Sequence, residues 1–375
     1  GDRGKFIGIV VGLTFAALLI CQQAGIFLGL MSRTYGFIAD TGQADVWAMD
    51  PKVQFVDDIK PLPDTKLYRV RAVSGAAWAV PLYKGLQKAR LADGTFQTCN
   101  VIGIDDGSLI GGPPTMLSGR LADLRQGDGV IVDDVAALEK LAHPPAVAGG
   151  RRQPLVVGDT LELNDHRAVV VGICRVSRTF QSQPVIYTTY TRAVTFAPKE
   201  RKQLAFILAK ALPGTTPAEL AANIVSSTGL AAYTQPDFIS LTYRYFMKNT
   251  GIPINFGISV ALGFLVGTAI AGQTFFQFTR DNLRYFGALK AMGASNGLLL
   301  RMVMLQAALV GALGYGLGVG AASLFGFLTR NSELAFILPW WLLLATGVAV
   351  SLICLAASLL SLQQVIRLEP GVVFR

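Results

Sequence analysis

Residue patterns that carry catalytic chemistry are scarce in this chain of 375 residues. It has two histidines, His143 beside two prolines and His166 at an expected turn, and neither stands at the spacing of a metal site or a catalytic triad. Adjacent carboxylates occur at three places, and we interpret them as solvated turn residues, because neighbours in a strand point to opposite faces. They are Asp57/Asp58, Asp105/Asp106 and Asp133/Asp134. The ATP-binding P-loop motif G-x-x-x-x-G-K-[ST] does not occur. We therefore expect no catalytic residue, no metal site and no cofactor in this chain.

A basic segment, "RDNLRYFGALKAMGAS" at residues 280–295, separates two long uncharged stretches. Its cations, with one just beyond it, are Arg280, Arg284, Lys290 and Arg301. Leu283, Phe286 and Leu289 recur at helical spacing and would form one face of a short helix. Gly293 is expected to end this helix, because glycine readily adopts the left-handed conformation of a helix stop. Such a segment can anchor to anionic lipid or meet acidic groups of a partner. The alternative is a loop made basic by membrane topology alone.

The elements that must position this segment are four uncharged runs, each longer than the ~20 apolar residues that cross a bilayer core. They are residues 6–32, 249–279, 302–329 and 334–366. The composition agrees, with 52% hydrophobic and 15% charged residues and a mean hydropathy of +0.46, whereas a soluble domain has about 25% charged residues. The first run is longer than the roughly 7–15-residue core of a signal peptide, so we expect it to remain as an uncleaved helix.

The distribution of cations predicts the orientation in the membrane. Outside the long insertion, eight Lys and Arg residues flank the runs on one side, against Arg330 on the other. By the positive-inside rule, both termini and the basic segment are then cytoplasmic, and the insertion lies outside. The net charge of +9 does not indicate nucleic-acid binding, because the insertion holds 24 Lys and Arg against 20 Asp and Glu and has no basic run with interleaved aromatic residues.

The sequence thus predicts a membrane α-helical protein with four transmembrane helices and a large mixed α/β extracytoplasmic domain inserted between helices 1 and 2. The predicted segments are 1–32 (N-terminal tail and helix 1), 33–248 (extracytoplasmic domain with a stalk), 249–279 (helix 2), 280–298 (basic cytoplasmic segment), 299–328 (helix 3), 329–336 (short external loop), 337–366 (helix 4) and 367–375 (cytoplasmic tail).

Short β-branched runs bounded by Gly, Asp and Pro predict strands in the insertion. The runs are "ADVWAM", "YRVRAV", "TCNVIGI", "GVIVDD", "DTLELND", "RAVVVGI", "PVIYTT" and "QLAFILAK". A hairpin is expected at Asn164, and a helix that is capped by Thr216 and ends at Gly229. A helical stripe near Phe238 predicts that the second transmembrane helix continues outside the membrane as a stalk, kinked at Pro253. Two cysteines of this domain, Cys99 and Cys174, are either a disulfide or two buried thiols.

Small residues recur four positions apart in the spans, a spacing that lets helix backbones approach closely. We single out Gly8, Gly12, Gly263 and Gly267 for packing between helices or between two copies of the chain. Ionisable residues are absent from the middle of the four runs. Since ion-coupled transporters usually need such residues, this argues against a secondary transporter.

Two segments and the order of the elements resemble a known family. "RDNLRYFGALKAMGASNGLLL", the tail "RLEPGVVFR" and the arrangement of one helix, a large external domain and three further helices are similar to permeases of the MacB/FtsX/LolC type, the type VII ABC systems. "VIVDDVAALEKL", "VVGDTLELNDHRAVVVGI" and "ADVWAM" are most similar to the DevC branch of DevBCA-type exporters. In one departure, Tyr285 occupies a position where the family commonly has an acidic residue.

The resemblance implies that 280–298 is a coupling helix seated on a separate ABC ATPase, which binds the ATP and Mg²⁺. The implied coupling residues are Arg280, Leu283, Arg284, Phe286, Gly287, Leu289, Lys290 and Gly293. It further implies a homodimer with two ATPase subunits in the bacterial inner membrane, which passes ATP-driven motion to its periplasmic domains (mechanotransmission). A periplasmic membrane-fusion protein and an outer-membrane channel would complete a tripartite exporter. Two alternatives stay open: a lipoprotein-releasing permease with an apolar, lipid-accessible cavity, and an FtsX-like regulator of a cell-wall hydrolase that transports nothing.

Overall fold

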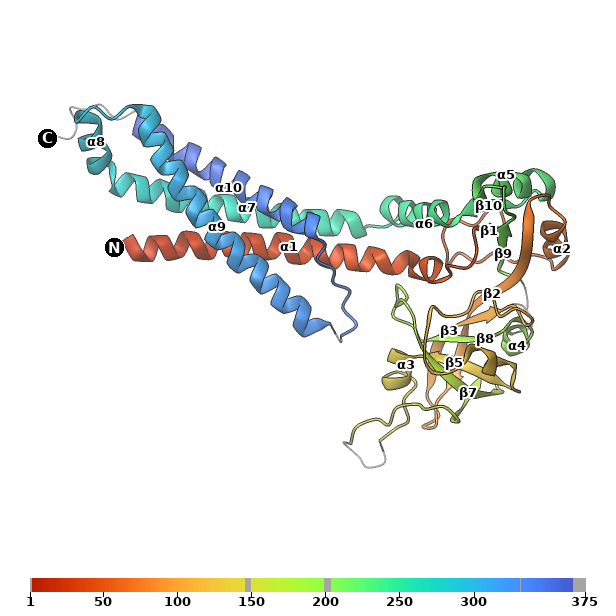
Figure 1. Ribbon diagram of the computed structural model, residues 1–375. Helices are drawn as coiled ribbons and strands as arrows, with labels where there is room; N and C mark the ends of the chain where they lie inside the picture. The colour runs from red at the N-terminus through yellow and green to blue at the C-terminus, as the bar shows by residue number, and fades with distance from the viewer. Residues whose placement is uncertain (1, 146–149, 199–203, 331, 367–375) are drawn as a thin grey trace. The chain divides into compact units, whose positions relative to one another are not determined.

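The computed structural model describes residues 2–145, 150–198, 204–330 and 332–366 (Figure 1). The predicted tail 367–375 lies outside the described residues. The chain forms two compact units. The membrane unit, as we call the first, comprises Gly1–Leu30 and Thr250–Arg375, and the insertion domain comprises Met31–Asn249.

Four helices are long and apolar enough to cross a membrane, as predicted. They are α1 (Asp2–Asp40), α7 (Ile252–Asp281), α9 (Asn296–Thr329) and α10 (Trp340–Ile366). A short helix, α8 (Leu283–Ala291), connects α7 to α9. The first helix ends at Asp40, well beyond the uncharged run 6–32, and contains no proline that would interrupt it.

The membrane unit has a core shared by all four long helices. Its buried side chains are Ile9, Leu13, Ala16, Ala17 and Ile20 of α1, Ala271 and Phe275 of α7, Ala307 and Val310 of α9, and Val350, Ile353, Cys354 and Ala357 of α10. Glycines allow the closest approaches. A Cβ added to Gly267 of α7 would lie 2.4 Å from the Cβ of Ala16, and one added to Gly318 of α9 would lie 2.6 Å from the Cβ of Ala17. Helix α1 is therefore packed directly on both α7 and α9.

The insertion domain is built on one mixed sheet with the strand order β10-β1-β9-β2-β3-β8-β5-β7-β4, in which β6 pairs with β2 and β7. The strands are β1 (Val46–Met49), β2 (Ala76–Arg90), β3 (Phe96–Ile104), β4 (Thr115–Gly119), β5 (Gly129–Asp133), β6 (Thr160–Leu163), β7 (His166–Arg175), β8 (Val185–Thr189), β9 (Phe206–Ala211) and β10 (Ala231–Thr234). Strand β3 is parallel to β8, and β5 is parallel to β7.

Strand β2 belongs to both halves of this sheet. Its residues 76–82 pair with β9, and its residues 83–90 pair with β3. We call β10, β1, β9 and residues 76–82 the first lobe, and residues 83–90 with the remaining strands the second lobe (Figure 1). The other elements are α2 (Thr65–Arg71), η1 (Leu121–Arg125), α3 (Asp134–Leu138), α4 (Tyr190–Phe196), α5 (Pro217–Thr228) and α6 (Gln235–Asn249).

Aromatic rings join α1 and α6 to the first lobe. The ring of Trp47 in β1 is fully buried, with its centroid 5.8 Å from Phe37 of α1, 5.6 Å from Phe206 of β9 and 5.5 Å from Phe238 of α6. Aromatic pairs at such distances add to the free energy gained from burial alone. The outer end of α1 and the helix α6 are thus fixed to the same core.

Several local predictions are confirmed. Strands β6 and β7 form the expected hairpin, with Asn164 and Asp165 both at positive φ in the turn. Helix α5 is capped by the hydroxyl of Thr216, which accepts from the N–H of Glu219, and it ends at Gly229 with φ of +68°.

Two local predictions are wrong, and three strands, β2, β4 and β10, were missed. The segment "YRVRAV" is mostly helix α2, in which Leu67 and Val70 are buried at helical spacing. The expected kink at Pro253 is instead a break: α6 ends at Asn249, and the proline lies in the first turn of α7, where it costs no hydrogen bond. The long strand β2 was missed because it contains Pro81, which is tolerated where β2 has β9 on one side alone.

The disulfide alternative for the two cysteines of the insertion domain is also wrong. Cys99 in β3 and Cys174 in β7 are both buried free thiols. Strands β8 and β5 lie between β3 and β7, which corresponds to roughly 14 Å at the usual strand spacing. A disulfide requires Cα atoms within about 7 Å. Burial raises the pKa of both thiols far above the usual value, so they are inert packing residues.

Candidate coupling site

The basic segment folds into α8, at the end of the membrane unit where α7 ends and α9 begins (Figure 1). The helix stops as a Schellman motif: the N–H of Ala294 donates to the carbonyl of Leu289 at 3.0 Å, and the N–H of Gly293 donates to Lys290 at 3.1 Å. Gly293 has φ of +96°, which favours glycine. The hydroxyl of Ser295 then accepts from the N–H of Leu298 and caps α9.

The apolar face predicted for α8 points into the membrane unit. Phe286 is 7% exposed and packs with Leu299 and Val303 of α9, and Leu289 lies partly buried against the same cluster. Gly287 is buried as well, and Leu283 is half-buried. These residues hold α8 against the beginning of α9, so a partner would not meet them first.

The opposite face of α8 is exposed. It consists of Arg284, Tyr285, Ala288, Ala291 and, just beyond the helix end, Met292. Tyr285 is 72% exposed and Met292 is 76% exposed. Of the predicted coupling residues, Arg284 lies on this outward face, Arg280 and Gly293 are exposed near it, and Lys290 is half-buried. The exposed residues Tyr285, Ala288 and Met292 are not among the predicted coupling residues, although the positions left over by the apolar spacing identify them as the outward face.

Polar contacts fix the neighbouring chain ends. The ammonium of Lys5, near the beginning of α1, pairs with the carboxylate of Asp281 at the end of α7. The side-chain amide of Asn282, which lies between α7 and α8, donates to the carbonyl of Phe278 at 2.9 Å. The beginning of α1, the end of α7, and α8 with the beginning of α9 therefore meet at one end of the membrane unit.

Three of the four glycines predicted for packing bring helices of one chain together. A Cβ on Gly12 would meet Ile270 of α7, and Cβ atoms on Gly263 and Gly267 would meet Leu19 and Ala16 of α1. Gly8 has nothing within 4 Å of its ideal Cβ position. Most of these glycines thus make contacts between helices of the same chain.

The residues considered for catalysis have structural partners. His143 pairs with Asp159 at 3.0 Å, and the ring of His166 packs against Phe196 at 5.8 Å. The carboxylate of Asp133 accepts from the N–H groups of Ala136 and Val185, and burial raises its pKa. In the described part of the chain, His, Cys, Asp and Glu do not gather in groups of three or more that could hold a metal ion.

Comparisons with known proteins agree with this architecture. Residues 6–227 match the family described as MacB-like periplasmic core domain, and residues 257–370 match the family described as FtsX-like permease C-terminal. No curated protein matches the chain.

Solved structures with similarity to this chain include three domains or regions of bacterial proteins. The periplasmic region of MacB from Actinobacillus actinomycetemcomitans has 16% identity and a TM-score of 0.38, covering 57% of this chain and 96% of that one. The extracellular domain of the noncanonic ABC-type transporter YknZ from Gram-positive bacteria has 14% identity and a TM-score of 0.34, covering 51% and 98%. A domain of a putative permease from Porphyromonas gingivalis has 11% identity and a TM-score of 0.32, covering 52% and 90%.

The first of the two family matches covers more than half of the chain, and the second covers α7 to α10. Four helices that can cross a membrane and a large mixed α/β domain between the first two of them complete the architecture. This multi-pass membrane protein belongs to the MacB/FtsX-type family of ABC transporter permeases.

Proposed function

We propose that this chain is the permease subunit of an ABC exporter, working as a homodimer with two copies of a separate ATPase, which binds the ATP and Mg²⁺. The observation that carries this proposal is the construction of α8. One face is anchored on α9 by Phe286, the helix ends in a Schellman motif, and the opposite face exposes Tyr285, Ala288 and Met292. An exposed short helix with apolar and aromatic side chains, rigidly held at its base, is suited to seat in a cleft of a partner.

A push on α8 would be transmitted to the long helices. Phe286 packs on Leu299 and Val303, so α9 must move with α8. The close contacts of Gly314 and Gly318 with α1, and of Gly267 with α1, leave no space for these helices to slide independently. Motion started by the ATPase would therefore reach α1 and α7, whose chain leads on into the insertion domain.

The finer assignment follows from the charge pattern and from the family. The eight cations at one side of the spans support a cytoplasmic α8 and a periplasmic insertion domain in the bacterial inner membrane. The similarity of the quoted segments to the DevC branch supports a tripartite exporter with a membrane-fusion protein and an outer-membrane channel.

One observation favours the lipoprotein-releasing alternative. Helices α9 and α10 form a groove of about 530 Å³, lined mainly by apolar and small residues. The lining includes Ala308, Gly311, Gly347 and Ser351, and the Ser351 hydroxyl donates within its own helix to the carbonyl of Gly347. Such a groove suits an acyl chain. Mass spectrometry of the complex purified from native membranes distinguishes the two functions, since a fusion protein supports the exporter and a bound lipoprotein supports the alternative.

The coupling role is tested by enlarging the exposed face of α8. Ala288→Trp places a bulky ring where the ATPase should seat, at a cost of about 1–3 kcal/mol for an overpacked contact. This corresponds to a roughly 5- to 150-fold loss of affinity for the ATPase. The control is Leu324→Trp, which enlarges an exposed position near the other end of α9.

Permease in nanodiscs is titrated with its ATPase, and binding and ATP turnover are measured. Ala288→Trp should lose binding and the stimulation of turnover, while Leu324→Trp should retain both. ATP hydrolysis by the purified permease alone, or wild-type binding by Ala288→Trp, would contradict the proposed function.

A further inference from the structure

The loop of residues 176–184, between β7 and β8, reaches from the second lobe to both helices that lead into the insertion domain. We call it the connector loop. Hydrogen bonds join it to α1. Asp40 accepts from the N–H of Ser177 at 2.7 Å and from the Ser177 hydroxyl at 2.9 Å, and the guanidinium of Arg33 donates to the Ser182 hydroxyl at 3.0 Å. Arg33 and Asp40, which lie two turns apart on α1, are thus both hydrogen-bonded to this loop.

The absence of a side chain at Gly36 allows this contact. A Cβ at this position would lie 2.6 Å from the Cβ of Ser177. The connector loop therefore lies directly on the backbone of α1, between the two hydrogen-bonded positions Arg33 and Asp40. Even a small displacement of α1 would displace the loop as well, because groups packed this closely transmit strain.

The contact with α6 is aromatic. The ring of Phe180 lies 5.0 Å from the ring of Phe246, which is 7% exposed. Phe246 and its neighbour Tyr245 also pack against Phe55, and the Phe55 and Tyr245 rings stack at 4.3 Å. The connector loop is therefore held by the last turn of α6, which the chain joins to α7 through Thr250 and Gly251.

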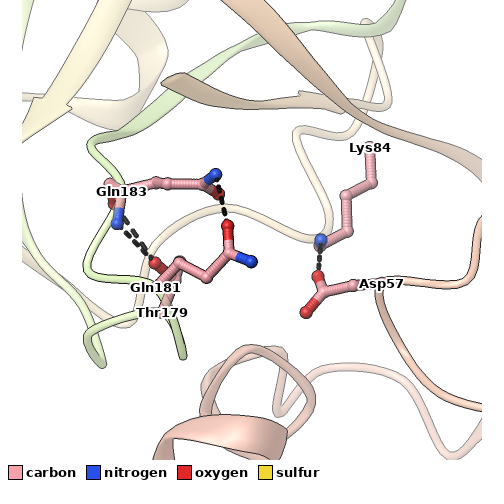
Figure 2. A network of polar contacts seen from close by, with 5 residues as sticks. All are labelled: Asp57, Lys84, Thr179, Gln181 and Gln183. Atoms are coloured by element: carbon pink, nitrogen blue, oxygen red, sulfur yellow. Dashed lines mark hydrogen bonds and ion pairs between the residues drawn. The ribbon is translucent and has the colours of Figure 1, made fainter. Parts of the chain in front are cut away.

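The connector loop has the internal bonding of a stiff element. The N–H of Gln183 donates to the hydroxyl of Thr179 at 2.8 Å, and the N–H of Ser182 donates to the Thr179 carbonyl at 2.9 Å. The amide of Gln183 also donates to Gln181 at 3.0 Å (Figure 2). On its second-lobe side, the Ser182 carbonyl accepts from Lys140 at 2.6 Å.

The loop passes without interruption into β8, whose five residues are all buried in the second lobe. The first of them, Val185, donates its N–H to the buried carboxylate of Asp133 at 2.6 Å, and the carbonyl of Pro184 accepts from the N–H of Asn100 in β3 at 2.7 Å. A displacement of the connector loop must therefore displace β8 and the strands paired with it.

A polar cavity lies behind the connector loop, at the point where β2 passes from one lobe to the other. The ammonium of Lys84 pairs with Asp57 (Figure 2) and lies 5.6 Å from the centre of the Phe37 ring of α1. The cavity has a volume of about 20 Å³, enough for roughly one water molecule. Into it faces Asn100, whose buried side-chain oxygen has no hydrogen-bond partner among the described residues.

From these contacts we infer that the connector loop is a mechanical joint, through which α1 and α6 act directly on the second lobe rather than through the first lobe alone. The inference rests on the proposed function, because it takes the two helices to be moved by the ATPase. The Asp40 bonds couple the loop to α1, and the Phe180 ring couples it to α6.

The test uses the double variant Asp40→Ala/Phe180→Ala in the full permease–ATPase complex in nanodiscs. Its matched control is Asp93→Ala/Phe96→Ala. Asp93 likewise accepts from a backbone N–H and a hydroxyl, both of Thr95, and Phe96 is an exposed aromatic residue of the second lobe. Neither control residue contacts α1 or α6 in the described contacts.

Deuterium exchange is measured by mass spectrometry with and without a non-hydrolysable ATP analogue. In the wild type and the control, the deuterium uptake of peptides from both lobes should change when the nucleotide is added, and we call this change the response. In the double variant the response of β8 should be lost, while that of the first lobe and the stimulation of ATP turnover persist. The milder variant Ser177→Ala, which removes one bond to Asp40, should give an intermediate response.

Distinct results overturn the joint and the proposed function. A β8 response in the double variant equal to that of the wild type overturns the joint. A wild type that stimulates ATP turnover but whose second lobe does not respond also overturns the joint and leaves the proposed function in place. A wild type that neither stimulates turnover nor responds in any lobe overturns both.

Discussion

The packing of α1 on α9 can be tested by adding one methyl group at either of two glycines of α9. A Cβ at Gly318 would lie 2.6 Å from the Cβ of Ala17 and 2.7 Å from the carbonyl oxygen of Thr14, whereas a Cβ at Gly316 has nothing within 4 Å. Both variants, Gly318→Ala and Gly316→Ala, make the same chemical change in the same helix, two residues apart. A difference between them must therefore come from the contact with α1.

The expected difference in unfolding free energy between the two variants follows from two opposing effects. Replacing glycine by alanine inside a helix stabilises it by up to about 1 kcal/mol, because the unfolded chain becomes less flexible. At Gly318 the added methyl group meets backbone as well as a side chain, so α1 must shift, and overpacking of this kind costs about 1–3 kcal/mol. Gly316→Ala should thus be neutral or slightly stabilising, and Gly318→Ala should be about 1–3 kcal/mol less stable than Gly316→Ala.

Reversible unfolding from detergent micelles, followed by circular dichroism while the fraction of denaturing detergent is raised, measures this difference. A second pair repeats the comparison, since a Cβ at Gly314 would lie 2.6 Å from the Cβ of Leu13 and one at Gly320 has nothing within 4 Å. Equal unfolding midpoints within both pairs, or a lower midpoint for Gly316→Ala than for Gly318→Ala, would show that α1 does not pack on this face of α9.

Two further predictions concern other parts of the chain. Hydrogen bonds from the backbone and the hydroxyl of Thr216 lower the pKa of Glu219, so the stabilisation they give to α5 is present above the unfolded pKa near 4.5 and is lost as the pH falls through the lower folded value. Thr216→Ala removes the hydroxyl but keeps the backbone N–H that donates to Glu219, so it should reduce this acid-side loss without abolishing it, and loss of the cap should cost about 1 kcal/mol, measured by hydrogen exchange of α5 against pH. A single cysteine at Ile254, which is 68% exposed near the beginning of α7, should crosslink between protomers when the native cysteines are replaced. The crosslinking yield should depend on nucleotide when the ATPase is present. Failure to crosslink in every state would contradict the proposed dimer geometry.

The sequence predicted best those features that depend on short stretches of chain. Four uncharged runs are sufficient to identify four membrane helices, because a continuous apolar run of this length crosses a bilayer as a helix that satisfies its own backbone hydrogen bonds. The turn at Asn164, the cap at Thr216 and the stop at Gly293 each depend on the conformational preferences of one or two residues. Local preference and final structure agree at these positions.

The features that the sequence did not reveal depend on distant partners. Strand β2 holds Pro81 at a place that is tolerated because of where β9 and β3 lie along it. In α8, the sequence identified an apolar face but not that α9 covers this face, so the coupling residues implied by the resemblance include the buried Phe286 and leave out the exposed Tyr285. The connector loop has no motif of its own, because its role comes from Asp40 and Phe246, more than sixty residues away on either side.

The strand shared by the two lobes also determines the order in which the insertion domain can be assembled. All strands of the second lobe lie between residues 83 and 189, whereas the first lobe needs β1 from before this interval and β9 and β10 from after it. During synthesis the second lobe is therefore complete first, while β1 still has no pairing partner. Residues 76–82 of β2, which the second lobe already holds in place, then present an edge on which β9 pairs, and β1 and β10 complete the first lobe after it. The slowest step in folding this domain should accordingly be the long-range closure of the first lobe.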